Sequence, residues 1–444
     1  MRKTQRRVSA LVAGVAIMAL ITGCAGSADS KSADGKKDGV ITYRSWSPVD
    51  QTTKDMIKVT EAANKDIKIE SEIFNYPEYL VDLSTRASSN SMPDIVGLQP
   101  GALTQQYRDK LMPLQDCAEK AWGKDWKEKF HPIGIEQARM GNPEGDENFY
   151  SLPLLVQTVN MWGNKQIMEK EGLSIPKTWD DLKAIAEKMK GKDKAGFMLP
   201  AKDGWLRNVV FLQIANNIEP GLAYKAEDGS DAWTNPRLVE ALSYWQKLFK
   251  EKIVQDGAMS LDAYPSGANQ FEAGNAAMIP LGAWWIQQSD PAKKDIAPLS
   301  KGMEGYEPFP FPTIPGGADT AQFVGGIDVA LGISKDTKNP EKACKVVTDW
   351  ISGKGAQTLT NTFNDIPAFK GINPEKFTSD HQKELWDTFT QQWLPQVKFS
   401  RYLKSPKMDQ LLSDQLAALA TGDTTPEKAA KVLQKKQEEV NKKK

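Results

Sequence analysis

Cysteine and histidine are scarce in this chain of 444 residues, which has three cysteines and two histidines. No group of Cys and His residues has the spacing of a zinc site, and no run has the alternating Asp/Asn pattern of a calcium loop. We therefore expect no metal site and no cofactor. Cys117 and Cys344 could form a disulfide outside the cell, but two cysteines in a large domain are as easily buried thiols.

The chain also lacks an excess of charge of either sign, because it has 57 basic and 57 acidic side chains. Removal of residues 1–23 would take away four arginines and lysines and no acid, leaving a slight excess of acidic groups. This balance gives no general electrostatic reason to expect nucleic acid as a partner.

Sequence motifs of catalysis are missing as well. The chain has no G-x-S-x-G, no H-E-x-x-H and no glycine-rich phosphate loop. The S-x-x-K match at 174–177 contains Pro176, which would break the helical turn that this motif needs. We therefore expect that this protein is not an enzyme. A glycoside hydrolase with two carboxylates far apart in sequence stays open, because spacing cannot exclude it.

The N-terminus has the order of an export signal: a basic start, an apolar run over 8–21, and small residues before Cys24. At ~1.5 Å per residue the run reaches roughly 21 Å, which is short of the ~30 Å of membrane hydrocarbon. The segment Ile21-Thr22-Gly23-Cys24 resembles the bacterial lipobox, in which the cysteine is lipidated and becomes the first mature residue. The alternatives are an ordinary signal peptide with a chance cysteine and a twin-arginine signal at Arg6-Arg7.

The segments after Cys24 predict a tether followed by an α/β body. Residues 25–38 are rich in Gly, Ser, Asp and Lys and have almost no apolar side chains, so they predict a flexible tether. Strand patterns over 67–74, 94–98 and 276–280 alternate with helix starts at Thr178, Asn235, Asn339 and Thr425. Proline-rich stretches at 142–153 and 308–317 interrupt the body. We interpret the second as a strap between domains rather than a surface loop or a ligand for a proline-reading module.

Five segments in this order resemble the sugar-binding family of extracytoplasmic solute-binding proteins of ABC importers, which includes the maltose-binding protein. They are Met92–Val96, Tyr150–Lys165, Ile175–Leu182, Phe271–Trp285 and Val324–Ser334, and the resemblance covers roughly residues 40–440. The chain departs from the family at Gly163, where an aromatic residue is usual. We expect that departure to leave room in the cleft or to remove a stacking surface.

The resemblance implies an α/β fold of the periplasmic-binding-protein type (type II), with two lobes joined by a hinge. Each lobe would be a mixed sheet flanked by helices. We expect residues 1–23 to be the signal peptide and 24–39 the tether. Lobe 1 would comprise 40–150 and 310–350, and lobe 2 would comprise 151–309 and 351–444, with the hinge near 148–156 and 308–316.

The implied function is a lipid-anchored, extracytoplasmic receptor that binds an oligosaccharide between the lobes and delivers it to permease subunits of an ABC importer. The receptor would be a monomer that meets the membrane only through its anchor. The alternatives are an exported carbohydrate-active enzyme, a non-catalytic adhesin, and a binding protein for a polyol or another small solute.

Sugar rings pack their C–H faces on aromatic rings, and their hydroxyl groups need polar partners. Trp284 and Trp285 follow a predicted buried strand, and the family places an aromatic ligand platform at Trp284. Trp205 corresponds to another platform, Trp46 and Gln99 follow predicted strands, and Asp328 is an acid between apolar residues. Gln157 and Trp162 lie where the family has ligand contacts. The alternative for each tryptophan is core packing, and for Asp328 it is a local backbone hydrogen bond.

Overall fold

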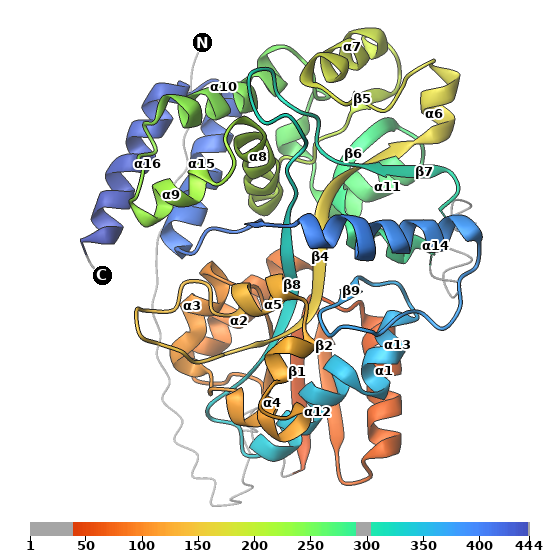
Figure 1. Cartoon of the computed structure of the whole chain (residues 1–444), viewed down its shortest axis with the longest axis vertical. Helices are drawn as coiled ribbons and strands as arrows, with labels where there is room; N and C mark the ends of the chain where they lie inside the picture. Colours follow the sequence, from red (N-terminus) through yellow and green to blue (C-terminus); the bar gives the residue numbers. More distant parts are fainter. Residues whose placement is uncertain (1–38, 290–302, 443–444) are drawn as a thin grey trace, which may run out of the picture. The chain divides into compact units, whose positions relative to one another are not determined.

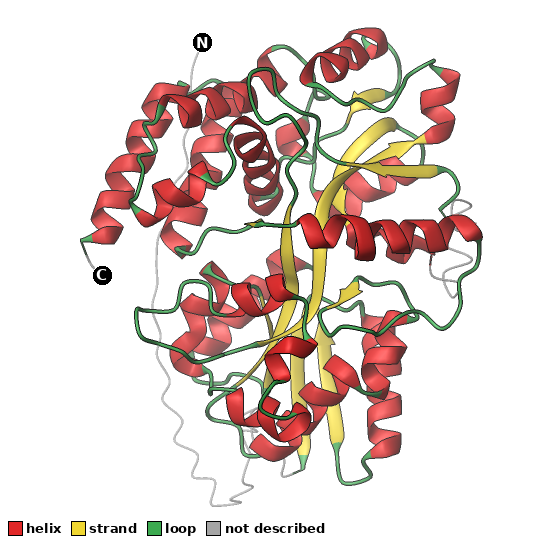
Figure 2. Ribbon diagram, viewed as in Figure 1, coloured by secondary structure: helices red, strands yellow, loops and turns green. Residues whose placement is uncertain are grey.

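The structure is a computed structural model that describes residues 39–289 and 303–442 (Figure 1). The predicted signal peptide, Cys24 and nearly all of the tether lie outside these residues. None of the described helices combines the length and the apolar composition that crossing a membrane requires. Helices and strands alternate along the chain, as the sequence predicts (Figure 2).

The described strands are β1 (Val40–Ser45), β2 (Lys68–Ile73), β3 (Ile95–Leu98), β4 (Leu152–Asn164), β5 (Ala195–Phe197), β6 (Ala276–Gly282), β7 (Tyr306–Phe309), β8 (Val324–Ile333), β9 (Ile366–Pro367) and β10 (Phe399–Ser400). The helices of the first half are α1 (Asp50–Ala63), α2 (Tyr76–Ser88), α3 (Ala102–Tyr107), α4 (Gln115–Trp122), α5 (Pro132–Ala138), α6 (Lys165–Lys170), α7 (Trp179–Met189) and α8 (Gly204–Ile218). The later helices are α9 (Leu222–Asp228), α10 (Pro236–Lys250), α11 (Ala268–Glu272), α12 (Pro340–Ser352), α13 (Lys354–Thr360), α14 (Asp380–Asp387), α15 (Pro406–Thr421) and α16 (Pro426–Asn441).

Two sheets share one long strand. The N-terminal sheet has the order β2-β1-β3-β8-β4, and β6 and β5 continue from β4 in the second sheet. Strand β4 pairs with β8 over 152–158 and with β6 over 159–163, so its two halves belong to different sheets. Strands β4 and β8 lie side by side (Figure 1), and every residue of both is buried.

The Gly325-Gly326 pair lets β8 approach its neighbours. A Cβ atom on Gly325 would lie 2.2 Å from the carbonyl oxygen of Gln157. Gly326 has φ +107°, and a Cβ atom there would lie 2.0 Å from Oε1 of Gln137. Because that space and backbone conformation exclude a side chain, this strand requires glycine at both positions.

The predicted helix starts are confirmed for the most part. Thr178 and Asp181 form the reciprocal capping box of α7, and the side chains of Asn235 and Thr425 cap α10 and α16. Asn339 precedes α12 but makes no side-chain capping bond, contrary to the expectation. The question that the sequence left open for Cys117 and Cys344 is answered by a disulfide between α4 and α12.

The packing differs in two places from the expected division of the chain. Helix α13 contacts α1, although residues 351–444 were expected in the other lobe. The proline-rich segment at 308–317 was expected to be a strap, but its first residues pair with β4 as β7. Ile314 then packs in a hydrophobic core formed by side chains of α7, α8 and α10. After this segment the chain returns to the N-terminal sheet through β8. The lobe boundaries stay a prediction.

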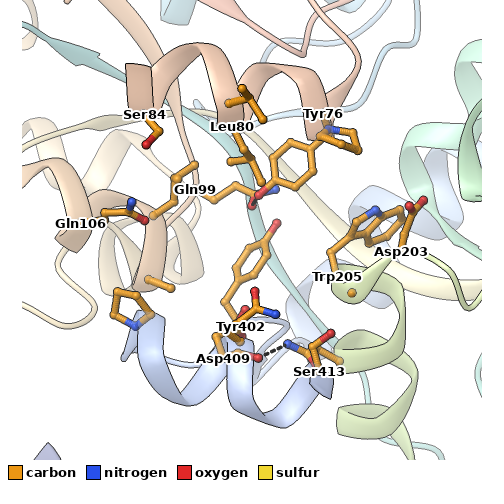
Figure 3. Close-up of a pocket in the computed structure, with 18 of the residues that line it drawn as sticks. Tyr76, Leu80, Ser84, Gln99, Gln106, Asp203, Trp205, Tyr402, Asp409 and Ser413 are labelled. Carbon is orange, nitrogen blue, oxygen red and sulfur yellow. Dashed lines mark hydrogen bonds between the residues drawn. The ribbon is translucent and has the colours of Figure 1, made fainter. Parts of the chain in front are cut away.

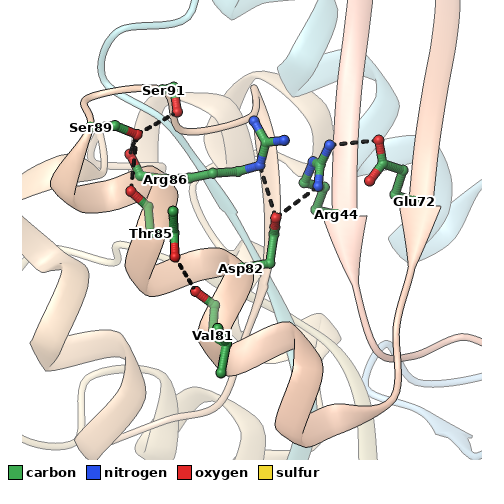
Figure 4. A network of polar contacts seen from close by, with 8 residues as sticks. All are labelled: Arg44, Glu72, Val81, Asp82, Thr85, Arg86, Ser89 and Ser91. Carbon is green, nitrogen blue, oxygen red and sulfur yellow. Dashed lines mark hydrogen bonds and ion pairs between the residues drawn. The ribbon is translucent and has the colours of Figure 1, made fainter. Parts of the chain in front are cut away.

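A polar network fixes α2 on the N-terminal sheet (Figure 4). Arg44 of β1 donates to Glu72 of β2 at 2.6 Å and to Asp82 of α2 at 2.9 Å. Arg86 of α2 donates to the same Asp82 oxygen at 3.1 Å. These bonds orient α2, and therefore also Tyr76, its first residue, which lies at the candidate site.

Candidate functional site

A cavity of about 390 Å³ lies where several strands end, and we call it the aromatic cavity. Five of its lining residues carry aromatic rings with a polar edge, on which a ligand could both pack and form hydrogen bonds. These residues are Trp46, Tyr76, Trp205, Tyr264 and Trp284. The other named lining residues used below are Gln99, Asp203, Asp328, Asn364 and Arg401.

The topology explains why these residues meet. Strands β1, β2 and β3 are parallel neighbours, so the residues that follow them lie at one edge of the sheet. Trp46, Tyr76 and Gln99 are those residues. Trp205 comes from the first turn of α8, and Trp284 follows β6 in a short 3-10 helix over Ala283–Ser289.

Trp284 is fixed by contacts on several sides. Its Nε1 donates to the Tyr264 hydroxyl at 2.7 Å, and its ring centroid lies 6.2 Å from that of Trp205. The Arg401 guanidinium carbon lies 5.6 Å from the Trp284 ring centroid. A Cβ atom on Gly282 would lie 1.8 Å from the Trp284 ring, so the ring occupies space that only glycine leaves free.

A buried polar cluster lies beside the aromatic rings. Oδ1 of Asp328 accepts from Arg401 at 2.6 Å and from Gln157 at 3.0 Å. Burial raises the pKa of Asp328, and the nearby Arg401 guanidinium opposes that rise. Asp365 is also buried, and burial together with the negative charge of Asp328 raises the pKa of Asp365 well above its usual range. The cluster joins β4, β8 and the segments next to β9 and β10, which are parts of the chain distant in sequence.

Of the eight predicted binding residues, five line the aromatic cavity: Trp46, Gln99, Trp205, Trp284 and Asp328. Gln157 does not line it but holds Asp328 from behind. Trp162 and Trp285 are 0% exposed and contact each other with ring centroids 5.0 Å apart in the core. The core alternative that the sequence left open therefore describes these two tryptophans, and they offer no surface to a ligand in this structure.

Gly163 does not lie at the aromatic cavity, so the expectation that it leaves room there is wrong. A Cβ atom on Gly163 would meet Met168 at 3.0 Å, Ile175 at 3.2 Å and Phe309 at 3.4 Å, and Gly163 does not line the cavity. Its missing side chain accommodates the packing of β4 against α6 and β7. It neither enlarges the aromatic cavity nor removes a stacking surface from it.

Sequence reasoning missed Tyr76, Tyr264 and Arg401. The strand-exit argument used for Trp46 and Gln99 applies equally to Tyr76, which begins the helix after β2, so that residue could have been found. Arg401 pairs with Asp328, which lies 73 positions earlier in the sequence. No local sequence pattern predicts this pair, because the contact forms only when β10 lies beside β8 in the folded protein.

Two sheets that share the strand β4, with an aromatic and polar cavity at the strand ends, define a ligand-binding protein. The chain belongs to the bacterial extracellular solute-binding protein family, whose sequence profile matches residues 45–358. The described residues contain no group of three or more His, Cys, Asp or Glu side chains that could hold a metal ion.

Several known proteins are similar to this chain. The multiple sugar-binding protein of Streptococcus mutans is 25% identical over 362 residues, which are 78% of this chain and 79% of that protein. The maltodextrin-binding protein MdxE of Bacillus subtilis is 25% identical over 84% of this chain and 82% of its own length.

An uncharacterised ABC transporter extracellular-binding protein of Pyrococcus horikoshii is 27% identical over 69% of this chain and 63% of its own length. Among solved structures, a chitin oligosaccharide binding protein superimposes with a TM-score of 0.75 at 22% identity, over 90% of this chain and 98% of that one. The chain is therefore similar to that protein in its fold.

Proposed function

We propose that this protein is an extracytoplasmic receptor that captures an oligosaccharide and delivers it to the permease subunits of an ABC importer. The observation that carries this proposal is the composition of the aromatic cavity. Its tryptophan and tyrosine rings offer faces for the C–H surfaces of sugars, while Gln99, Asn364 and Asp328 offer polar atoms for sugar hydroxyls. The sugar-binding and maltodextrin-binding relatives support the same class of ligand.

A thermal-shift screen tests the ligand class. Purified protein is heated with mono- and oligosaccharides of the malto-, xylo- and chito- series, and with amino acids and divalent metal ions as the comparison set. A ligand that binds only the folded protein at 100 times its Kd stabilises that protein by about 2.7 kcal/mol, so a sugar should raise the melting temperature. Stabilisation confined to amino acids or metal ions would overturn the proposal.

The same sugars distinguish a receptor from an exported enzyme. We expect the bound oligosaccharide to be recovered unchanged after prolonged incubation, since the cavity offers binding surfaces and the sequence has no G-x-S-x-G or H-E-x-x-H motif. Cleavage of the oligosaccharide that is abolished by a single Asp or Glu substitution would show that the protein is an enzyme instead.

We also propose that Cys24 carries the lipid that holds the mature protein at the membrane. Each buried methylene of an acyl chain contributes ~0.8 kcal/mol to membrane binding. The Cys24→Ala variant should therefore appear in the soluble fraction with unchanged affinity for the sugar, because this cysteine precedes the predicted tether. A variant that stays in the membrane fraction would exclude the anchor.

A further inference from the structure

Asp365 belongs to the buried polar cluster but does not line the aromatic cavity, unlike its neighbour Asn364. Asp365 is 0% exposed, and its Oδ1 accepts from the backbone nitrogen of Ile366 at 2.9 Å. Its second carboxyl oxygen, Oδ2, is buried and has no hydrogen-bond partner among the described residues. Buried polar atoms in folded proteins nearly always have a partner, so this oxygen requires an explanation.

The pairing of β9 with β4 brings Asp365 opposite Gln157. Val156 of β4 pairs with Ile366 of β9 in antiparallel register, so the next positions in that register are Gln157 and Asp365. Opposite residues of antiparallel strands have their side chains on the same face, with Cβ atoms about 5 Å apart. Oε1 of Gln157 is also buried without a partner in the part of the chain that the structure describes. The register therefore brings two unpaired oxygens to one face of β4.

A proton on Asp365 would satisfy both oxygens. An amide oxygen and an ionised carboxylate only accept hydrogen bonds, whereas a protonated carboxyl group also donates one. Nε2 of the same Gln157 amide donates to Oδ1 of Asp328 at 3.0 Å. A bond from Asp365 to Oε1 would therefore fix the Gln157 amide at both ends, and with it the carboxyl group of Asp328, which lines the cavity.

The charges of the cluster favour the protonated form of Asp365. Two carboxyl groups share one guanidinium, that of Arg401, which already donates to Asp328 at 2.6 Å. If both carboxyl groups were ionised, the cluster would contain a buried negative charge without a partner, which is unfavourable. Burial and the negative charge of Asp328 accordingly raise the pKa of Asp365, although the bond from Ile366 and the charge of Arg401 oppose the rise.

The remaining titratable groups near the cluster come from three directions. Tyr264 faces both carboxyl groups from the segment before α11, and it stays neutral because burial raises its pKa. Helix α13 packs against β9, and its charged side chain, Lys354, is exposed. Asp203, just before α8, lines the aromatic cavity, and Asp409 of α15 lines the hollow that adjoins it (Figure 3). The charges within the cluster itself therefore have the largest effect on its titration.

We propose that Asp365 is a positioning residue for sugar binding, which keeps a proton and donates a hydrogen bond to Oε1 of Gln157. Gln157 then holds Asp328 in the orientation that offers its oxygens to a sugar hydroxyl. Loss of the proton would break this bond and make Asp365 a second partner for Arg401, so affinity should fall as the pH rises. The inference rests on the proposed function, and it adds a residue behind the cavity and a pH dependence of binding.

Two substitutions separate the hydrogen-bond donor of Asp365 from its size. Asparagine keeps the shape of the protonated acid and an N–H donor, so Asp365→Asn should bind the sugar within about twofold of the unaltered protein at about pH 5. Asp365→Leu has a similar size without a donor, so it should bind about fivefold more weakly. Calorimetric titration with the sugar that stabilises the protein most in the thermal-shift screen measures both. Melting curves check the fold, and if Asp365→Leu does not fold, the pH profile of Asp365→Asn decides.

That pH profile tests the proton. With an uncharged sugar, a change in Kd between about pH 5 and 9 arises from groups of the protein. The unaltered protein should lose about fivefold in affinity as the pH rises, because ionised Asp365 lacks the donor, whereas Asp365→Asn should lose less. Glu227 and Asp409 titrate in the same range but are present in both proteins, so the difference between the profiles measures Asp365. The matched control is Asp319→Asn, exposed and outside the cavity lining, which should reproduce the unaltered profile.

Infrared spectroscopy tests the proton without any ligand. A protonated carboxyl group has a C=O stretching band at higher frequency than the bands of a carboxylate. The difference spectrum between the unaltered protein and Asp365→Asn, recorded at about pH 6, should contain the band of the protonated acid, although a free Asp is ionised at that pH. Carboxylate bands in its place would overturn the proposal.

The binding results can also overturn it. If Asp365→Asn binds as weakly as Asp365→Leu, the site needs a negative charge at this position, as a partner for Nε of Arg401, which is likewise buried and unpaired among the described residues. Unchanged affinity in both variants, or equal pH profiles of the unaltered protein and Asp365→Asn, would show that Asp365 does not position the ligand contacts. Failure of every carbohydrate to bind would overturn the receptor function, while the infrared band would still decide whether Asp365 keeps a proton.

Discussion

Trp284 and Trp285 are neighbours in sequence with opposite surroundings. Trp284 lines the aromatic cavity and contacts Tyr264, whereas Trp285 is fully buried with a ring centroid 4.7 Å from that of Tyr306. The sequence marked both as candidates because both follow a predicted buried strand. Their difference arises in the 3-10 turn after Gly282, where one ring turns to the cavity and the other to the core. Sequence spacing does not determine that choice.

Replacement of Trp284 by alanine should weaken sugar binding without unfolding the protein. Loss of an aromatic platform at a binding hot spot costs ~2 kcal/mol or more, which corresponds to about thirtyfold in Kd. Calorimetric titration of Trp284→Ala measures the affinity, and a melting curve checks the fold. An unchanged Kd would show that the ligand does not use this ring.

Replacement of Trp285 by alanine should mainly reduce the stability of the protein, because this ring lies in the core. The substitution would leave a large cavity among Trp162, Phe271 and Tyr306, and such changes typically cost about 3–5 kcal/mol of stability. Urea unfolding of Trp285→Ala measures that loss, and Trp285→Phe, which keeps an aromatic ring in the core, is the matched control. Stability of Trp285→Ala equal to that of Trp285→Phe would contradict the assignment of Trp285 to the core.

At the scale of elements, the turn between β10 and α15 carries Arg401 and Tyr402 to the ligand-binding region. Glu227 of α9 holds this turn from outside that region, because its Oε1 accepts from the backbone nitrogen of Ser405 at 2.8 Å. Burial raises the pKa of Glu227 to about 7, although the bonds from Ser405 and Lys404 and the charge of Lys404 oppose the rise. Burial also raises the pKa of Asp409 to about 6, and Asp409 accepts from Leu403 in the same turn.

These raised pKa values predict a dependence of stability on pH. Between about pH 4.5 and 7 the folded protein keeps a proton on Glu227 that the unfolded chain has released. The folded state therefore binds more protons, and its stability falls as the pH rises through this window. Above pH 7 both states are ionised, and the contribution of Glu227 becomes constant.

The Glu227→Gln variant should lose this part of the pH dependence. It should be more stable than the unaltered protein at pH 8, by about 1–3 kcal/mol, and similar to it at pH 4.5. Urea unfolding at both pH values measures the difference, and Glu438→Gln, at an exposed position of α16, is the control. A pH profile that Glu227→Gln leaves unchanged would contradict the assignment.

The elements that could be predicted from sequence are those with strong local signals. The capping box at Thr178 and the buried strands over 94–98 and 276–280 are confirmed within a few residues. The proline-rich segment at 308–317 begins in an edge strand, β7, which tolerates Pro308 and which the sequence did not predict, and its role as a strap between domains stays a prediction. The position of α13 could not be predicted, because its partner α1 is nearly three hundred residues earlier.

At the scale of the whole molecule, strands β4 and β8 are the connection about which the ligand-binding walls could move. The N-terminal half of β4 pairs with β8, and its C-terminal half pairs with β6 and β7. A ligand that contacts residues on both sides of this connection gains contacts only when the two sides approach, which supplies the differential affinity that closure requires.

Saturation with the sugar should therefore reduce the radius of gyration measured by small-angle X-ray scattering. Trp284→Ala, measured at the sugar concentration that saturates the unaltered protein, should show a smaller change because less of it is occupied. An unchanged radius of gyration at saturation would show that the protein binds without closing.

The position of β8 in the N-terminal sheet also limits the order in which the chain can fold. Strand β8 lies between β3 and β4, so the N-terminal sheet is incomplete until residue 333 has been synthesised. Contacts between residues so distant in sequence slow folding, because a long loop must close before they form. The topology that brings Asp328 to the cavity thus also delays completion of the N-terminal sheet until three quarters of the chain has been synthesised.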